Sequence, residues 1–204
     1  MDILGKLFSS TALVKIMRLF LLNPDTPFEN NDIMEKSKVT RSSLRTEMSI
    51  LQSIKFVKKK TFYKEIPKKT KNGKPKKKKV SGWCLNHGFE YLAPLKVLLV
   101  NTASVDHKDI VNKFKNTGKI KLIVLSGIFI KESTGHVDML VVGDNIKKNA
   151  LERVLRSIES EIGKELVYAA IDTKEFNYRL NMYDKFIRDI FDYPHTKVID
   201  KIGV

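Results

Sequence analysis

Apolar residues at helical spacing predict three short helices in the N-terminal part of the chain. The first helix has an apolar face made by Leu13, Ile16, Met17 and Phe20. Pro24 and Pro27 end this helix, because proline donates no backbone hydrogen bond and disfavours helix in the residue before it. A second short helix, capped by Asn30, Asn31 or Asp32, would turn Ile33 and Met34 toward the core.

A third helix is predicted from an N-cap at Thr40 to about Ile54, after a turn at 37–39. Its buried stripe is Leu44, Met48 and Leu51. The candidate DNA-contacting residues are the cap and the polar side chains on the opposite side: Thr40, Arg41, Ser42, Ser43, Arg45, Thr46 and Ser49. Short hydroxyls and arginine forks can reach phosphates and base edges. An ordinary solvent-exposed helix face is the alternative interpretation.

The pattern then changes to that of a β-hairpin. Residues 56–66 are rich in aromatic and β-branched side chains and predict a strand, and residues 80–85 predict its partner. Asn72-Gly73, near the middle of the connection, favours the tight turn of a hairpin. The segment is therefore expected to form one long hairpin.

Charge is concentrated in this hairpin. From Lys55 to Lys79 there are 13 lysines and one acidic residue, Glu65, so this stretch holds +12 of the chain's +15 net charge. Such a field indicates a polyanionic partner, although a solvated or disordered loop has the same composition. The candidate phosphate contacts are Lys58, Lys59, Lys60, Lys64, Lys68, Lys69, Lys71, Lys74, Lys76, Lys77, Lys78 and Lys79.

Three helices followed by such a hairpin resemble the winged-helix family over about residues 11–86. The resemblance implies that the third helix enters the major groove of double-stranded DNA and that the hairpin lies along the backbone or the minor groove. Lysine is a mobile point charge, so the hairpin should add affinity rather than sequence choice.

Beyond the hairpin, an apolar stripe over residues 89–99 predicts a helix that links two domains or pairs with a second copy. A helix at 106–116 and an alternation of strands and helices follow, with strands at 120–125, 137–142, 166–171 and 197–199 and helices at 147–162, 175–180 and 183–191. The expected fold class is α+β. A winged-helix domain at 1–88, a linker helix at 89–104 and a small α/β domain with a mixed sheet at 105–204 are expected.

The run Leu125-Ser126-Gly127, followed by 136–144, resembles the core of minimal nucleotidyltransferases over about residues 105–200. In that family a Gly-Ser pair cradles the triphosphate, and an Asp-x-Asp strand holds two magnesium ions for in-line displacement. Here the pair is reversed and His136 replaces the first aspartate. The resemblance therefore implies a catalytically degenerate domain without catalytic residues, metal or cofactor. Its residual nucleotide pocket would contain Ser126, Gly127, His136 and Asp138.

The carboxylates of this region have alternative interpretations. Asp138 is either a remnant of the site or a structural carboxylate, hydrogen-bonded to backbone amides or paired with a lysine. Asp144 and Asp172 either replace the missing metal ligands of the site or are ordinary turn and cap residues. The single cysteine, Cys84, is expected to be a buried strand residue in a reducing compartment.

The expected function is that of the transcriptional regulators which the chain resembles, with sequence-specific binding of double-stranded DNA and a second domain that dimerises or senses a small-molecule or nucleotide effector. Homodimerisation and a cytoplasmic location are expected, with no membrane association. One alternative is an active nucleotidyltransferase whose protein or nucleic-acid substrate is held by the basic hairpin. Another is an RNA-binding or nucleoid-coating protein without sequence choice.

Overall fold

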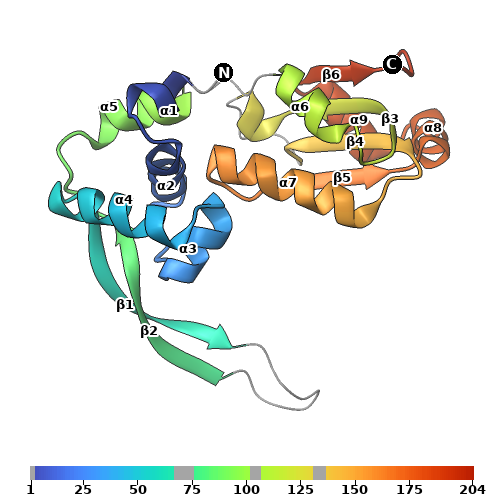
Figure 1. Cartoon of the computed structure of the whole chain (residues 1–204). Helices are drawn as coiled ribbons and strands as arrows, with labels where there is room; N and C mark the ends of the chain where they lie inside the picture. The colour runs from blue at the N-terminus through green and yellow to red at the C-terminus, as the bar shows by residue number, and fades with distance from the viewer. Residues whose placement is uncertain (1–2, 67–75, 102–106, 131–136) are drawn as a thin grey trace. The chain divides into compact units, whose positions relative to one another are not determined.

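The computed structural model describes residues 3–66, 76–101, 107–130 and 137–204 and shows a mixed α/β protein (Figure 1). The chain divides into two compact units. The first contains Met1–Thr102 with Ser160–Lys164, and the second contains Ala103–Glu159 with Glu165–Val204. Within the described ranges, no helix has both the length and the apolar character needed to span a bilayer.

The three predicted helices and the hairpin occur in the first unit in the predicted order, and a short helix that the sequence did not predict, α1, precedes them. The elements of this unit are α1 (Ile3–Leu7), α2 (Thr11–Leu22), α3 (Asn30–Ser37), α4 (Arg41–Ser53), β1 (Val57–Ile66), β2 (Lys76–Leu85), α5 (Leu92–Lys96) and the π-helix η1 (Val97–Asn101). The strand predicted at 80–85 begins earlier, at Lys76. The predicted Asn72-Gly73 turn lies outside the described residues. The single helix predicted over 89–99 is instead two segments, α5 and η1, that meet shortly after Pro94.

Side-chain caps explain where the helices begin. Thr40 accepts a hydrogen bond from the Ser43 N–H at the start of α4, as predicted. Ser10, which the sequence analysis did not name as a cap, accepts one from the Leu13 N–H at the start of α2. The predicted cap of α3 was wrong. The N-cap is Glu29, whose backbone N–H donates to the Asp32 carboxylate from outside the helix. Asp32, in the first turn of the helix, thus accepts a hydrogen bond from the backbone of the N-cap residue, as in a capping box.

The core of the first unit forms where α2 meets the other elements. Its largest buried side chains include Phe20 of α2, Ile33 of α3, Leu51 of α4 and Phe56 beside β1. Leu99 of η1 is fully buried in the same cluster, so the apolar stripe after the hairpin packs on this core. The burial of such aromatic and aliphatic groups supplies most of the stabilisation.

The hairpin that β1 and β2 form, here called the lysine hairpin (Val57–Leu85), is attached at its base to the segment before α3. The strands pair antiparallel from Val57↔Leu85 to Ile66↔Lys76. Phe28 and Trp83 exchange two backbone hydrogen bonds of 2.9 Å. A Cβ at Gly82 would lie 2.3 Å from the Phe28 carbonyl oxygen, so only glycine permits this approach. Cys84 is buried in β2, as predicted.

The second unit is built on a four-stranded mixed sheet. Its elements are α6 (His107–Phe114), β3 (Lys119–Leu125), the 3-10 turn η2 (Gly127–Phe129), β4 (Met139–Asp144), α7 (Lys148–Ile162), β5 (Tyr168–Ile171), α8 (Thr173–Asn181), α9 (Lys185–Asp192) and β6 (Thr196–Asp200). The strand order is β5-β4-β3-β6, and only the pair β4 and β5 is parallel. The predicted strands at 137–142 and 166–171 begin two residues later than expected.

Both faces of this sheet are covered. Leu122 and Val124 of β3 pack with Phe176 of α8 and with residues of α9. Ile123, which lies between them and points to the other face, is also fully buried. The central strands β3 and β4 are therefore apolar on both sides, which explains their nearly continuous hydrophobic sequences.

Candidate nucleic-acid interface

Helix α4 presents a continuous polar face to solvent. Leu44, Met48 and Leu51 are buried, as predicted, and hold the helix on the core. On the opposite side the exposed residues are Thr40, Arg41, Ser42, Arg45, Thr46 and Ser49, while Ser43 is half-buried. The two arginines are four residues apart and lie on one side of the helix. The polar residues named from the sequence thus form a single surface.

Some hydroxyls of this surface already have partners. The Thr40 hydroxyl lies 3.0 Å from that of Ser42 and caps the helix. Thr46 donates to the Ser42 carbonyl at 3.3 Å. The hydroxyls of Thr40 and Thr46 therefore also serve the helix itself. The long arginine side chains extend beyond the helix surface and are better suited to recognition.

Glu47 is an acidic residue of α4 that sequence reasoning missed. It is 8% exposed, and the Ser10 hydroxyl donates to its carboxylate at 2.6 Å. Ser10 also caps α2, so the carboxylate is held beside a helix N-terminus, where negative charge is favourable. The sequence did contain a signal, because position 47 is three residues after Leu44 and four before Leu51 and so shares the buried face. This contact fixes α4 relative to α2.

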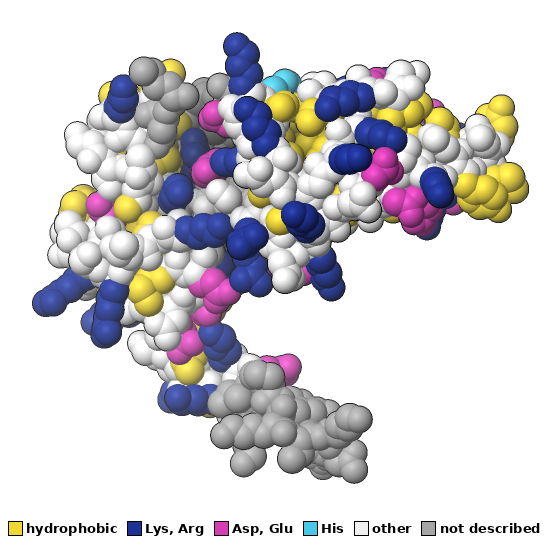
Figure 2. Space-filling model, turned by 45° about the vertical axis from the view of Figure 1, so that its right-hand side comes forward, with side chains coloured by type: hydrophobic (Ala, Val, Ile, Leu, Met, Phe, Trp, Pro, Cys, Tyr) yellow, Lys and Arg dark blue, Asp and Glu magenta, His cyan; other side chains and the backbone are white. Residues whose placement is uncertain are grey.

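The described stem of the lysine hairpin is densely basic (Figure 2). Lys58, Lys59, Lys60, Lys77, Lys78 and Lys79 are exposed. Lys59 lies 5.7 Å from the centre of the Trp83 ring, a cation–π distance that steadies the stem. Lys77 and Glu65 are 3.9 Å apart but about two-thirds exposed, so this pair contributes little. Lys76 begins β2, and Lys68, Lys69, Lys71 and Lys74 lie outside the described residues.

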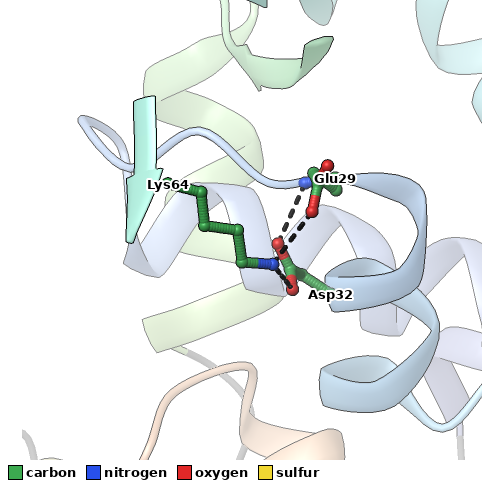
Figure 3. A network of polar contacts seen from close by, with 3 residues as sticks. All are labelled: Glu29, Asp32 and Lys64. Atoms are coloured by element: carbon green, nitrogen blue, oxygen red, sulfur yellow. Dashed lines mark hydrogen bonds and ion pairs between the residues drawn. The ribbon is translucent and has the colours of Figure 1, made fainter. Parts of the chain in front are cut away.

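Lys64 differs from the other lysines of the hairpin (Figure 3). Its ammonium lies 2.9 Å from a Glu29 oxygen and 2.6 Å from an Asp32 oxygen. Hydrogen bonds to Asp32 and then Glu29 raise the pKa of Lys64 above its ordinary value. The sequence predicted a phosphate contact here. In the structure the ammonium instead holds two carboxylates and connects β1 to the start of α3, so the phosphate contact stays a prediction that would require these ion pairs to break.

The second predicted site, the residual nucleotide pocket, has a structural carboxylate at its centre. One Asp138 oxygen accepts from the Ile128 N–H and the other from the Val167 N–H, both at 2.9 Å. Gly127 has a φ of +54°, and a Cβ there would lie 2.3 Å from the Asp138 carboxylate. The Ser126 hydroxyl donates to the Val137 carbonyl. Of the two interpretations of Asp138, hydrogen bonding to backbone amides agrees with this geometry.

The other candidates of the second unit also have structural roles. Asp172 caps α8 by accepting from the Glu175 N–H. Asp144 lies 2.9 Å from the Lys121 ammonium, and the neighbouring Thr173 side chain and Lys121 lower the pKa of its carboxyl. His136 lies outside the described residues. Within the described part of the chain, no three His, Cys, Asp or Glu side chains gather in a group that could hold a metal ion.

The first unit also contains an apolar cavity of about 400 Å³, which the sequence did not predict. It lies among Phe8, which follows α1, the helix α2, the C-terminal end of α4 and residues 89–98, and it is lined by Ile50 of α4 and by Ile54, the residue after α4. This volume is in the range of small-molecule sites. An effector that bound here would be an apolar compound rather than a nucleotide.

Comparisons with protein-family models, with curated proteins and with solved structures gave no match. The winged-helix and nucleotidyltransferase resemblances therefore stay predictions. The order of helices and strands, the exposed face of α4 and the contacts of Asp138 are the observations on which a function can be proposed.

Proposed function

We propose that this chain is a sequence-specific double-stranded DNA-binding protein of the winged-helix type and acts as a transcriptional regulator. Helix α4 would enter the major groove, and the lysine hairpin would follow the phosphate backbone or the minor groove. The observation that supports this most strongly is the exposed face of α4, where Arg41 and Arg45 lie beside hydroxyl side chains. Arginine forks pair with guanine edges, and hydroxyls reach phosphates and bases.

The distribution of charge supports a polyanionic partner for the first unit. This unit has 22 Lys and Arg side chains against 9 Asp and Glu, a net of +13, whereas the second unit has 16 against 14, a net of +2. A charge of +13 on roughly half of the chain opposes compact folding unless counter-charge is near. Duplex DNA supplies such counter-charge along its backbone, at two phosphates per base pair.

The second unit would be a catalytically degenerate, nucleotidyltransferase-like domain that serves dimerisation or effector binding. Both oxygens of Asp138 are occupied by backbone amides, which favours a structural carboxylate over a metal ligand. The intracellular role of a regulator also agrees with an expected cytoplasmic location. An active nucleotidyltransferase would require Asp138 to hold a metal ion, and this geometry does not favour it.

The decisive experiment is selection of bound sequences from a random duplex pool at about physiological salt, where nonspecific lysine contacts are weakened. We expect an enriched motif. The same selection is repeated with Arg41→Ala and Arg45→Ala, which should relax the motif at individual positions because each removes about 1–3 kcal/mol of base discrimination. Lys174→Ala, an exposed lysine of α8, is the matched control and should leave the motif unchanged.

The lysine hairpin is tested separately. Replacing Lys77, Lys78 and Lys79 by alanine should weaken binding to all duplexes alike and reduce the magnitude of the log–log salt slope by about 0.9 per lost phosphate contact.

Three outcomes would favour another function. Tight binding without an enriched motif would contradict a sequence-reading role for α4. A preference for RNA over duplex DNA would favour the RNA-binding alternative. Nucleotide turnover with magnesium that is lost in Asp138→Asn would establish the transferase instead.

A further inference from the structure

The two edges of the sheet in the second unit differ in their protection (Figure 1). Strand β6 has the features that keep an edge from pairing with another chain. It contains Lys197 and Asp200, which lie 3.5 Å apart, its pairing with β3 has an irregularity, and Pro194 precedes it. Strand β5 is only four residues long, but it has none of these other features. The run Leu166-Val167-Tyr168-Ala169-Ala170-Ile171 contains neither a charged residue nor a proline.

The outer edge of β5 has a defined pattern of backbone groups. Met139 N–H donates to the Val167 carbonyl at 3.3 Å, and β4 and β5 run parallel in the register Met139↔Tyr168. In a parallel pair, the N–H and C=O of one residue point to the same side, and neighbouring residues alternate. Residues 167, 169 and 171 therefore face β4, and the backbone groups of Tyr168 and Ala170 face away from the sheet.

The side chains on this edge alternate in the same way. Ala169 and Ile171 pack against the core shared with α8 and α9. Tyr168 and Ala170 point to the opposite face, where Tyr168 is 40% exposed and Ala170 is exposed as well. Val167, just before the strand, is 58% exposed. The outward backbone groups thus lie between exposed apolar side chains, which is the composition of a strand that pairs.

We propose that β5 pairs antiparallel with β5 of a second copy of this chain, so that two four-stranded sheets join into one. A two-fold axis normal to the sheet beside Ala169 would place Tyr168 opposite Ala170 of the second copy and Ala170 opposite its Tyr168. Each of these facing pairs exchanges two backbone hydrogen bonds, because both residues have outward N–H and C=O groups. The large ring of Tyr168 then covers the small Ala170 across the seam, on the same face.

A second copy fits this edge better than a different partner for two reasons. The seam is self-complementary, since the same two residues supply both the donors and the acceptors and both the large and the small side chain. Charge also favours it, because the second unit has a net charge of only +2 and the strand itself has none.

The first experiment measures the dimer dissociation constant of the full chain by sedimentation equilibrium without DNA. Two double variants with matched substitutions test the register. Tyr168→Lys with Ala170→Lys places like charges opposite each other twice and should raise the dissociation constant at least about tenfold. Tyr168→Glu with Ala170→Lys places opposite charges there twice and should keep the dimer. Circular dichroism and thermal melting check that both variants fold.

A cysteine experiment gives an independent readout on otherwise unchanged chains. Facing residues on the two-fold axis in a pair without hydrogen bonds have Cα atoms about 4.5 Å apart, which is within the range of a disulfide. Ala169→Cys should therefore form a covalent dimer on mild oxidation. Ala170→Cys should not, because its facing residue is Tyr168, and the wild-type chain has only the buried Cys84.

A wild-type chain that stays monomeric at about 100 μM, well above the dissociation constants of stable homodimers, would overturn the proposal. Equal dissociation constants for the two double variants, or equal cross-linking of the two cysteine variants, would also overturn it. None of these measurements contains DNA. A dimer with the predicted register and no DNA motif would thus refute the proposed function alone, and a motif bound by a chain that never dimerises would refute only the β5 pairing.

Discussion

The Ser10 hydroxyl donates a 2.6 Å hydrogen bond to the buried Glu47 carboxylate, and the same hydroxyl oxygen accepts from the Leu13 N–H. One side chain therefore caps α2 and also satisfies an acidic group of α4. Because α4 bears the proposed DNA-reading face, its position depends on this contact. The Ser10–Glu47 hydrogen bond therefore stabilises the N-terminal region and also helps to orient Arg41 and Arg45.

Ser10→Ala should destabilise the first unit. The substitution removes a helix cap and leaves a buried carboxylate without its donor, which together cost about 1–3 kcal/mol of unfolding free energy. Chemical denaturation followed by circular dichroism measures the loss. Ser49→Ala, an exposed serine of α4, is the control and should change stability by less than about 0.5 kcal/mol. Equal stability of the two variants would show that the contact is not formed in solution.

Gly82→Ala should also destabilise the first unit, through the base of the hairpin. The added Cβ would lie 2.3 Å from the Phe28 carbonyl oxygen, and this oxygen is a backbone atom that accepts from the Trp83 N–H. The backbone must shift, and overpacking of this kind costs about 1–3 kcal/mol. Gly88→Ala is the matched control, since its nearest contact would be an ordinary 3.7 Å. Thermal melting of both variants measures the difference in stability. A Gly82→Ala protein as stable as Gly88→Ala would disprove the close approach of Gly82 to the Phe28 carbonyl oxygen.

The sequence predicted local features well and tertiary pairings poorly. Thr40 as a cap, the stripe of Leu44, Met48 and Leu51, and the two hairpin strands follow from short-range rules and are confirmed. Whereas the Glu29 cap is a local contact within residues 29–32 that was predicted one to three residues too late, the partners of Lys64 depend on which segments meet in three dimensions. So does the parallel pairing of β4 with β5. A lysine in a basic run looks the same whether it faces solvent or two carboxylates from another element.

Lys64 and Lys58 should respond differently when each is replaced by alanine. Lys58 is exposed in the structure, and if it neutralises a phosphate, its removal lowers the magnitude of the log–log salt slope by about 0.9. The Lys64 ammonium already holds Glu29 and Asp32, so Lys64→Ala should leave the slope unchanged. DNA titrations at several salt concentrations give both slopes.

Lys64→Ala should instead lower stability, by no more than about 1 kcal/mol because its side chain is 42% exposed. Lys64→Arg, which keeps the charge, should recover most of that loss. If Lys64→Ala reduced the slope as much as Lys58→Ala, the ion pairs would be broken on the DNA and Lys64 would be a phosphate contact after all.

Asp138→Asn should destabilise the second unit by about 1–3 kcal/mol, because one amide that donated to the carboxylate then faces a side-chain NH₂ group and loses its acceptor. Gly127→Ala should act on the same contact from the other side. Its Cβ would lie 2.3 Å from the Asp138 carboxylate, and its φ is +54°. Gly203→Ala separates the two causes, since Gly203 also has a positive φ, +79°, but nothing within 4 Å.

We expect Gly127→Ala to lower the melting temperature clearly more than Gly203→Ala, since only the former adds a steric clash to the cost of backbone strain. DNA affinity should be the same in both variants and in Asp138→Asn while the fold persists. Lower stability together with unchanged DNA affinity would identify Asp138 as a structural carboxylate. A stable Asp138→Asn protein would show instead that the amides of Ile128 and Val167 do not need the charge, which would leave Asp138 free for the ligand role that a nucleotidyltransferase gives it.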